Sequence, residues 1–300
     1  MSLNIKGVIV PPVTPFDAAG EIDVPAIQRL VDFLIDRGVN ALFPGGTTGE
    51  GPLLTTDERR RLAEAFVAAA DNRIPVIVHT GAITTQIAHE LTRHARAIGA
   101  QAAALIPPYY YKCDDAALRH HFTTIANAVP DFPIYLYNNP ARTGNALSSE
   151  LMDDLLEQCP NIVGMKDSSG DLKTLFAMSV SKDGAFNTAS GNDEQILAGL
   201  AMGFDACVSG NANVVPELVV ALYRSVVQGD LATARGLQYK LDAVREILED
   251  GADLSLFKGI LARRGLPVGH VRAPLMQAPE SVIAERWQAL CTLNLNLESA

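Results

Sequence analysis

Short β-rich segments alternate with longer amphipathic segments through most of the chain, and this alternation constrains the fold more than any other feature. The β-rich segments cover residues 7–10, 41–43, 76–79, 102–106, 134–137, 162–166, 186–190 and 206–209. The segments with helical spacing cover residues 24–37, 57–70, 87–98, 116–129, 148–158, 172–180, 194–202 and 216–228. A strand–helix–strand order implies a parallel sheet, because parallel strands are joined by crossover connections.

The number of strand–helix units selects one α/β architecture over another. Eight units are typical of a (β/α)8 TIM barrel, which takes about 250 residues. The alternative is a doubly wound open sheet, which normally carries a G-x-G-x-x-G turn after its first strand. Residues 11–21 stand at that position and read PPVTPFDAAGE. The sequence therefore predicts an α/β protein of the TIM-barrel class.

The alternation stops after residue 228. Residues 231–249, 254–264 and 280–295 all have helical patterns without intervening strands. We therefore predict a catalytic barrel domain at residues 1–228 and a C-terminal helical region at residues 229–300, packed on the barrel. Helix caps are expected at Thr56, before an Asp-Glu pair, and at Ser148.

Charge and composition exclude several classes of protein. The 300 residues carry 24 basic and 34 acidic side chains, a net charge of −10, and no long Lys/Arg cluster, so nucleic acid and anionic membranes are poor partners. The N-terminal apolar run ends at Pro11-Pro12 and fits neither a signal peptide nor a transmembrane helix, which predicts a cytoplasmic location. Four widely spaced cysteines without a CxxC pair are expected to be reduced. The adjacent His120 and His121 are expected on a solvated helix rather than at a metal.

Lys166 ends an apolar strand and is an unusual residue in that position. A buried ammonium group without a partner loses several kcal/mol of hydration free energy. One interpretation is a strand-end ion pair with a carboxylate such as Asp167. The other is a nucleophilic amine whose pKa is lowered by desolvation, which forms a Schiff base with a carbonyl substrate.

Other strand ends carry residues that suit the second interpretation. In TIM barrels the C-terminal strand ends converge on the active site. The second strand leads into FPGGTTGEG, in which glycines and the adjacent Thr47 and Thr48 form a cradle for a carboxylate or an ordinary turn. The fifth strand ends with Tyr137, a candidate proton relay, and Arg142 follows as a candidate carboxylate clamp. Residues 109–111 are three tyrosines, which also suit a covered interface. Together these groups favour Schiff-base chemistry, which requires no metal.

Five ordered motifs resemble the dihydrodipicolinate synthase and N-acetylneuraminate lyase family of class I, pyruvate-dependent aldolases. The resemblance covers essentially the whole chain. The motifs are GTTGE at 46–50, PYY at 108–110, YNNPARTG at 137–144, GMKDSSGD at 164–171 and VSGNAN at 208–213.

The resemblance implies roles for individual residues. Lys166 would be the Schiff-base lysine for pyruvate or another 2-oxo acid, with Tyr137, Thr48 and Tyr110 relaying protons. Tyr110 would act in the site of a neighbouring subunit. Substrate binding would fall to Thr47, Arg142, and the main chain of Gly191 and Val208. The resemblance also implies a homotetramer built as a dimer of dimers, and catalysis without a metal or an organic cofactor.

The aldehyde partner is the less determined half of the reaction. Arg142 matches the synthase branch of the family, whose arginine holds the carboxylate of aspartate 4-semialdehyde, and this implies condensation of that aldehyde with pyruvate. Gly51-Pro52 is also similar to aldolases and dehydratases that act on 2-keto-3-deoxy-sugar acids, and a lyase of the N-acetylneuraminate type is a further alternative. A catalytically silent regulator that binds a 2-oxo acid is the alternative from outside enzymes.

Overall fold

Eight parallel strands form a nearly closed barrel in the computed structural model, which describes residues 3–295 and residue 297. The strands are β1 Gly7–Val10, β2 Ala41–Leu42, β3 Ile77–His79, β4 Ala102–Leu105, β5 Ile134–Asn138, β6 Ile162–Asp167, β7 Asn187–Ser190 and β8 Ala206–Val208. Their order around the sheet is β2-β1-β8-β7-β6-β5-β4-β3, and a parallel bridge between Leu42 and Val76 joins its two ends. The predicted (β/α)8 barrel is confirmed.

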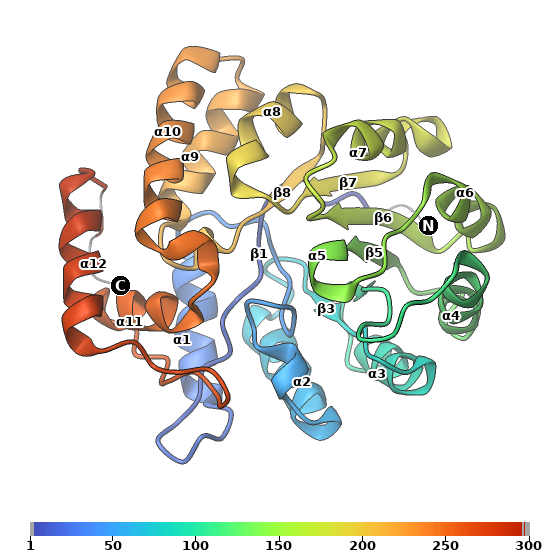
Figure 1. Cartoon of the computed structure of the whole chain (residues 1–300), viewed down its shortest axis with the longest axis horizontal. Coiled ribbons are helices and arrows are strands. Elements are labelled where there is room, and N and C mark those ends of the chain that lie inside the picture. Colours follow the sequence, from blue (N-terminus) through green and yellow to red (C-terminus); the bar gives the residue numbers. More distant parts are fainter. Residues whose placement is uncertain (1–2, 296, 298–300) are drawn as a thin grey trace.

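Helices surround the strands on the outside of the barrel (Figure 1). They are α1 Val24–Asp36, α2 Thr56–Ala70, α3 Thr85–Ala97, α4 Asp115–Asn127, α5 Pro140–Thr143, α6 Ser149–Gln158, α7 Leu172–Ser179, α8 Ile196–Ala201, α9 Pro216–Val227, α10 Leu231–Ile247, α11 Leu254–Arg263 and α12 Glu280–Thr292. Short 3-10 turns are η1 Gly51–Leu53, η2 Ser181–Gly184, η3 Asp193–Gln195, η4 Asn211–Asn213 and η5 Glu249–Gly251. The predicted strands and main helices agree with these bounds to within a few residues.

Two hydrophobic cores follow from the alternation of side chains along each strand. One core fills the barrel interior and includes Ile9, Phe43, Tyr135 and Tyr137. The larger core lies between the barrel and its helices, where α1 buries Leu30 and other residues spaced at helical periodicity. Strands of a TIM barrel are thus buried on both faces, which explains their continuous apolar pattern.

Two details of the helices differ from the sequence prediction. The segment predicted as one helix over residues 194–202 is divided into η3 and α8, and the short helix α5 was not predicted. The N-cap of α2 is Thr55, not Thr56: the Thr55 hydroxyl accepts from the Glu58 amide at 3.2 Å, while the Glu58 carboxylate accepts from the Thr55 amide at 2.8 Å. Thr56 is the first helical residue and cannot serve as the cap. Ser148 caps α6 as predicted.

Replacing Thr55 with alanine is expected to lower the free energy of unfolding by about 1 kcal/mol, because the first turn of α2 loses its reciprocal cap. Thr56→Ala is the matched control and is expected to change the stability by less than half of that amount. Chemical denaturation of both variants provides the measurement. Equal losses in the two variants would contradict the assigned cap.

The C-terminal helices α10, α11 and α12 lie together on one side of the barrel (Figure 1). Helix α10 packs against α9 and η3, and α11 packs against η4, which follows β8. The segment after residue 228 therefore contacts the loops at the C-terminal ends of β7 and β8. The domain boundary at 228/229 stays a prediction, although it falls between α9 and α10.

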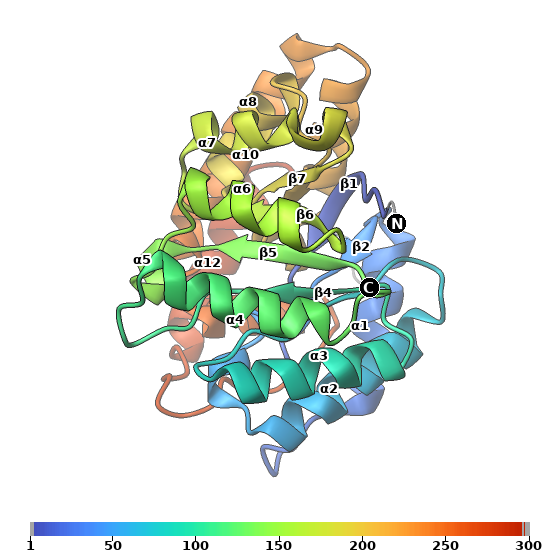
Figure 2. The same cartoon turned by 90° about the vertical axis from the view of Figure 1, so that its right-hand side faces the viewer.

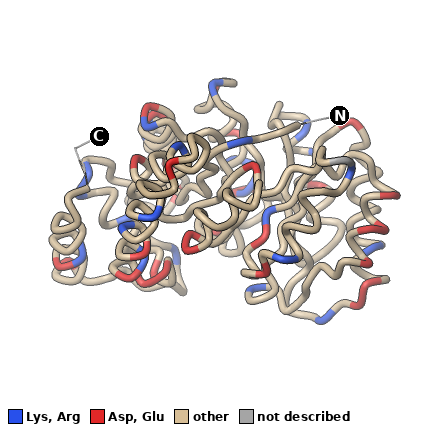
Figure 3. The backbone as a smooth tube through the Cα atoms, turned by 90° about the horizontal axis from the view of Figure 1, so that it is seen from above, with Lys and Arg blue, Asp and Glu red and all other residues tan. Residues whose placement is uncertain are grey.

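Acidic and basic residues are interspersed over the helices (Figure 3). Of the two adjacent histidines, only His120 is exposed. The prediction that both are solvated is wrong for His121, which is buried and hydrogen-bonded through Nδ1 to the Thr85 hydroxyl at 2.9 Å, because its side chain faces α3. Burial, with a smaller contribution from His120, lowers the pKa of His121 to about 4. Within residues 3–295 and 297, no helix has the length and hydrophobicity needed to cross a membrane.

Candidate active site

The register of two neighbouring strands brings Lys166 and Tyr137 together. Their Cα atoms are partners in the pairing of β5 with β6, and both side chains face the barrel interior. Lys166 is only 7% exposed, and its Nζ lies 4.1 Å from the centroid of the Tyr137 ring and 4.9 Å from that of Phe43. Aromatic faces attract the ammonium form, so it is held here without an ionic bond.

The structure tests the alternative in which Lys166 pairs with Asp167. Successive side chains of a strand point to opposite faces, so the Asp167 carboxylate leaves the barrel interior. One of its oxygens accepts from Asn138 Nδ2 at 2.7 Å, and the other accepts from the amide and hydroxyl of Ser169 at 2.7 and 2.6 Å. Among the described residues, no carboxylate lies within 4.0 Å of Lys166 Nζ. The ion-pair interpretation is therefore wrong.

Tyr137 is buried, with its phenol oxygen hydrogen-bonded to the Asn139 side-chain amide at 2.8 Å. Burial alone would raise its pKa. The positive charge of Lys166 and hydrogen bonding with Thr47, Asn139 and Ser168 outweigh burial, so the pKa of Tyr137 lies below its usual value. The phenol thus loses its proton more readily than an ordinary tyrosine, which suits it for proton transfer near the lysine.

His79, at the end of β3, is a site neighbour that the sequence analysis missed. Its ring centroid lies 5.9 Å from that of Tyr137 and 6.0 Å from that of Phe43. Burial, followed by the charges of Arg59 and Lys166, holds the pKa of His79 well below its ordinary range. The imidazole is therefore neutral and adds no second positive charge beside the lysine. Only the strand-end position of His79 could have identified it from sequence.

The glycine-rich loop after β2 presents backbone donors to the site. The amides of Thr47 and Thr48 donate to no protein acceptor within the part of the chain that the structure describes. The loop is tightly folded: a Cβ at Gly51 would lie 1.9 Å from the carbonyl oxygen of Gly45, and the Thr14 hydroxyl donates to the Gly49 carbonyl at 2.5 Å. Free amides in a rigid, close-packed loop suit a carboxylate ligand.

Gly191 and Val208 line the same cavity as the lysine, and their predicted main-chain contacts with substrate stay a prediction. The Gly191 amide donates to the carbonyl of Asp167 at 2.6 Å, so it has no free hydrogen for a substrate. A Cβ at Gly191 would lie 2.1 Å from Ser168 Oγ and 2.9 Å from Lys166 Cε. Glycine is needed there to make room for the lysine side chain. Val208, on β8, is buried and forms part of the cavity wall.

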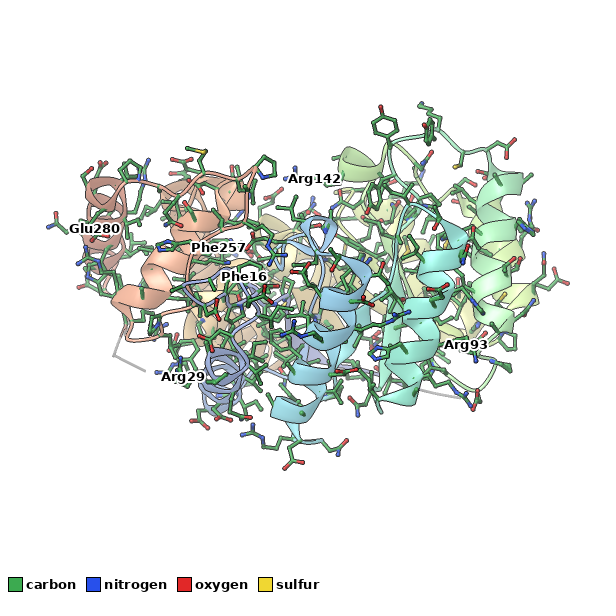
Figure 4. The ribbon with its side chains drawn as sticks, turned by 90° about the horizontal axis from the view of Figure 1, so that it is seen from below. Phe16, Arg29, Arg93, Arg142, Phe257 and Glu280 are labelled. Atoms are coloured by element: carbon green, nitrogen blue, oxygen red, sulfur yellow. The ribbon has the colours of Figure 1, made fainter. Side chains whose placement is uncertain are left out.

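These groups line one cavity of about 240 Å³ at the C-terminal ends of the strands. Its lining includes Lys166, Tyr137, Thr47, Thr48, Gly191 and Val208. Arg142 lies on α5, which follows the arrowhead end of β5 (Figure 2), and its side chain, labelled in Figure 4, lines the same cavity. The lining also includes Asp193, Glu194, Asn211 and Asp250, together with Arg245, which pairs with both Glu194 and Asp250.

Tyr110 is the one predicted site residue that does not line this cavity. It is 85% exposed, with a φ of +82° and its ring against Tyr111 at a centroid distance of 5.0 Å. A second cavity of about 280 Å³ adjoins the first, with Thr47 and Arg142 lining both. Within the described residues, no group of three His, Cys, Asp or Glu side chains is placed to hold a metal ion.

Comparisons with known proteins agree with this geometry. A model of the dihydrodipicolinate synthetase family matches residues 4–290. A 4-hydroxy-tetrahydrodipicolinate synthase from an Exiguobacterium species is 39% identical over 93% of this chain and 94% of the relative. A probable 2-dehydro-3-deoxy-D-pentonate aldolase from Escherichia coli is 37% identical over 92% of this chain and 93% of its own. The crystal structure of the E. coli prophage protein YagE with pyruvate superposes with a TM-score of 0.90 at 32% identity, covering 97% and 99% of the two chains.

Proposed function

Because this chain belongs to the dihydrodipicolinate synthetase family, whose members are lyases and aldolases, we propose that Lys166 forms an imine with pyruvate or a related 2-oxo acid. One observation carries the proposal: Lys166 Nζ lies in the cavity, against the Tyr137 ring, with no carboxylate partner in the described chain. An amine held in this way is available to attack a carbonyl once it loses its proton. The family member YagE, which was crystallised with pyruvate, supports the choice of 2-oxo acid.

The proposed reaction begins when deprotonated Lys166 adds to the ketone carbon of pyruvate. The carbinolamine hydroxyl takes a proton from the relay and leaves as water, which gives a cationic imine. Loss of a proton from the neighbouring methyl group produces an enamine, and its carbon adds to an aldehyde. Water then hydrolyses the product imine and frees the lysine, and the reverse sequence cleaves a 2-oxo-4-hydroxy acid.

The structure favours an exchange of roles between the two threonines. The sequence analysis assigned the relay to Thr48 and substrate binding to Thr47. In the structure, Thr47 is the threonine close enough to the Tyr137 phenol to lower its pKa. We therefore assign the relay to Tyr137 and the Thr47 hydroxyl, while the amides of both threonines receive the substrate carboxylate. The chemistry needs neither a metal nor an organic cofactor, because the iminium nitrogen itself withdraws electrons.

Tyr110 enters this proposal through a second subunit. Its exposed ring has no contact with its own catalytic cavity, whereas the adjoining cavity leaves Thr47 accessible from outside. A homotetramer built as a dimer of dimers would let Tyr110 of one subunit extend the relay at Thr47 of another. The exposed ring and the open cavity support this arrangement.

For the aldehyde we propose aspartate 4-semialdehyde, because Arg142 lies at the cavity and has no carboxylate partner among the described residues. A guanidinium binds a carboxylate through two parallel hydrogen bonds. The second candidate is cleavage of a 2-dehydro-3-deoxy-sugar acid. Its support is the polar cavity lining, which includes Asp193 and Asn211 and suits substrate hydroxyl groups, and the similarity to the pentonate aldolase.

Replacing Arg142 with methionine separates the two candidates. If the substrate is aspartate 4-semialdehyde, we expect kcat/KM for it to fall about 100-fold, equivalent to about 2.7 kcal/mol for a lost charged hydrogen-bonded pair, with imine formation from pyruvate unchanged. Steady-state kinetics with this aldehyde and with 2-dehydro-3-deoxy-pentonate provide the measurement. Turnover of the sugar acid alone, insensitive to the substitution, would favour the second candidate.

A further inference from the structure

The loop that carries Thr47 and Thr48 is anchored by a buried ion pair. Glu50 follows Thr48 by two residues and adopts a left-handed backbone conformation with a φ of +57°. Its carboxylate oxygen Oε1 lies 2.7 Å from Nζ of Lys258 on α11, and both side chains are fully buried. The pair therefore connects the substrate-binding loop to the C-terminal helices.

A cage of further contacts holds both members of the pair. The second oxygen of Glu50 accepts from the backbone amide of Arg272 at 2.7 Å, and Lys258 donates to the carbonyl of His270 at 2.7 Å. Lys258 Nζ also lies 4.3 Å from the centroid of the Phe16 ring. Two segments distant in sequence, at Lys258 and at Arg272, thus bind the Glu50 carboxylate, while His270 and Phe16 hold Lys258.

Arg272 extends this cage to the start of α2. Its guanidinium binds Glu58 Oε1 at 2.6 Å and stacks 4.5 Å from the Phe16 ring centroid, while it also donates to the carbonyl of Gly20 at 2.6 Å. Glu58 is the residue that caps α2 together with Thr55. The loop that carries Thr47 and Thr48 is consequently held at Glu50 and again at the first turn of α2, the α-helix that follows it.

We propose that Glu50 and Lys258 are positioning residues, which set the amides of Thr47 and Thr48 at the place where they receive the carboxylate of the 2-oxo acid. A buried ion pair is a weak source of stability, because desolvation offsets its attraction, but its geometry is demanding. Here the ion pair joins Glu50, whose backbone is in the left-handed conformation, to α11, which lies far from it in the sequence. The test of this inference measures the trapped pyruvate adduct, so the inference rests on the imine chemistry proposed above for Lys166.

This arrangement gives the region after residue 228 a part in substrate binding. Phe257 lines the catalytic cavity, and Lys258 beside it binds Glu50 in the loop whose Thr47 and Thr48 line the same cavity. Burial lowers the pKa of Lys258, while the adjacent Glu50 carboxylate opposes this change. The C-terminal helices are therefore a structural component of the active site and not only a cover for the barrel.

The test uses Glu50→Gln, Lys258→Met and the double variant, each incubated with increasing pyruvate and trapped with borohydride. We expect the pyruvate concentration for half-maximal adduct to rise at least tenfold in all three variants, with the amount of adduct at saturation within twofold of the unaltered protein. Glu217→Gln is the matched control, since Glu217 pairs with the buried Arg264, the residue that follows α11, but lies outside the loop that carries Thr47 and Thr48. In this control, the pyruvate concentration for half-maximal adduct is expected to stay within twofold of the value for the unaltered protein.

Melting temperatures separate positioning from stability. The double variant leaves neither Glu50 nor Lys258 as an unpaired buried charge, so its melting temperature is expected to exceed that of the less stable single variant. It should still need the raised pyruvate concentration for half-maximal adduct. If Lys258→Met does not fold, the double variant and Glu50→Gln decide the question. Half-saturation equal to that of the unaltered protein, with only the melting temperature reduced, would overturn the positioning role. Failure of the unaltered protein to form any adduct would instead overturn the proposed imine chemistry.

Discussion

Replacing Lys166 with alanine is expected to abolish the covalent pyruvate adduct and to lower kcat/KM by about 10⁴-fold or more, because the variant has no amine in the cavity. Intact mass after incubation with pyruvate and borohydride is the first measurement, followed by peptide mapping of the reduced adduct. The expected adduct on the unaltered protein is a single pyruvyl group on Lys166. The variant should show the mass of the unmodified chain.

The Lys166→Ala experiment has a clear control in the exposed Lys173 of α7, which follows the same strand by a few residues. Lys173→Ala should keep both adduct and turnover. An adduct that persists in Lys166→Ala, or that maps to another lysine, would remove the central support of the proposed function. The melting temperature checks that the alanine variant still folds, because the substitution removes both a buried ammonium group without an ionic partner in the described chain and its contacts with the Tyr137 and Phe43 rings.

The barrel could be predicted because its strands and helices have clear local patterns in the sequence. Each strand is a short apolar run and each helix has an apolar stripe, so their order alone predicts the architecture. The predictions that the structure corrects concern residues whose role or burial depends on tertiary or side-chain contacts. The cap of α2 moved from Thr56 to Thr55 because Glu58 reaches the Thr55 amide, and His121 is buried because its side chain faces α3.

The site was predictable to the extent that strand ends converge in a TIM barrel. Lys166, Tyr137, the two threonines and Arg142 are brought together because they end or follow the three strands β2, β5 and β6. Which threonine faces the phenol depends on loop geometry, which spacing does not determine.

The supporting residues were beyond prediction for a different reason. Glu50 and Lys258 form an ion pair only because the chain returns to the barrel after α10, and neither has a local signal of its partner. His79 has its strand-end position as its single local signal, and its role is clear only when its neighbours Phe43 and Tyr137 are placed. The reactive groups are thus marked by their position in the sequence pattern, whereas the groups that support them are determined by distant contacts.

Replacing Tyr137 with phenylalanine is expected to lower kcat about 10²- to 10³-fold, because the relay loses the phenol that exchanges a proton with the reacting groups. The pyruvate concentration for half-maximal adduct should change less than threefold, since the amides of Thr47 and Thr48 remain. The adduct should form slowly but still map to Lys166. Single-turnover trapping over time, together with steady-state kinetics, measures both quantities.

The pH profile gives the Tyr137→Phe experiment a second readout. The pKa of Tyr137 is lowered, so the phenol begins to lose its donor proton below the pH at which an exposed tyrosine ionises. Turnover of the unaltered protein should therefore decline as pH rises through that range, and the variant should lack this limb. Tyr135→Phe is the matched control: Tyr135 lies two residues earlier in the same interior core, bonded to Asn187 Oδ1 at 2.8 Å. Its kcat should stay within twofold, and an equal loss in both variants would mean that packing, not proton transfer, explains the effect.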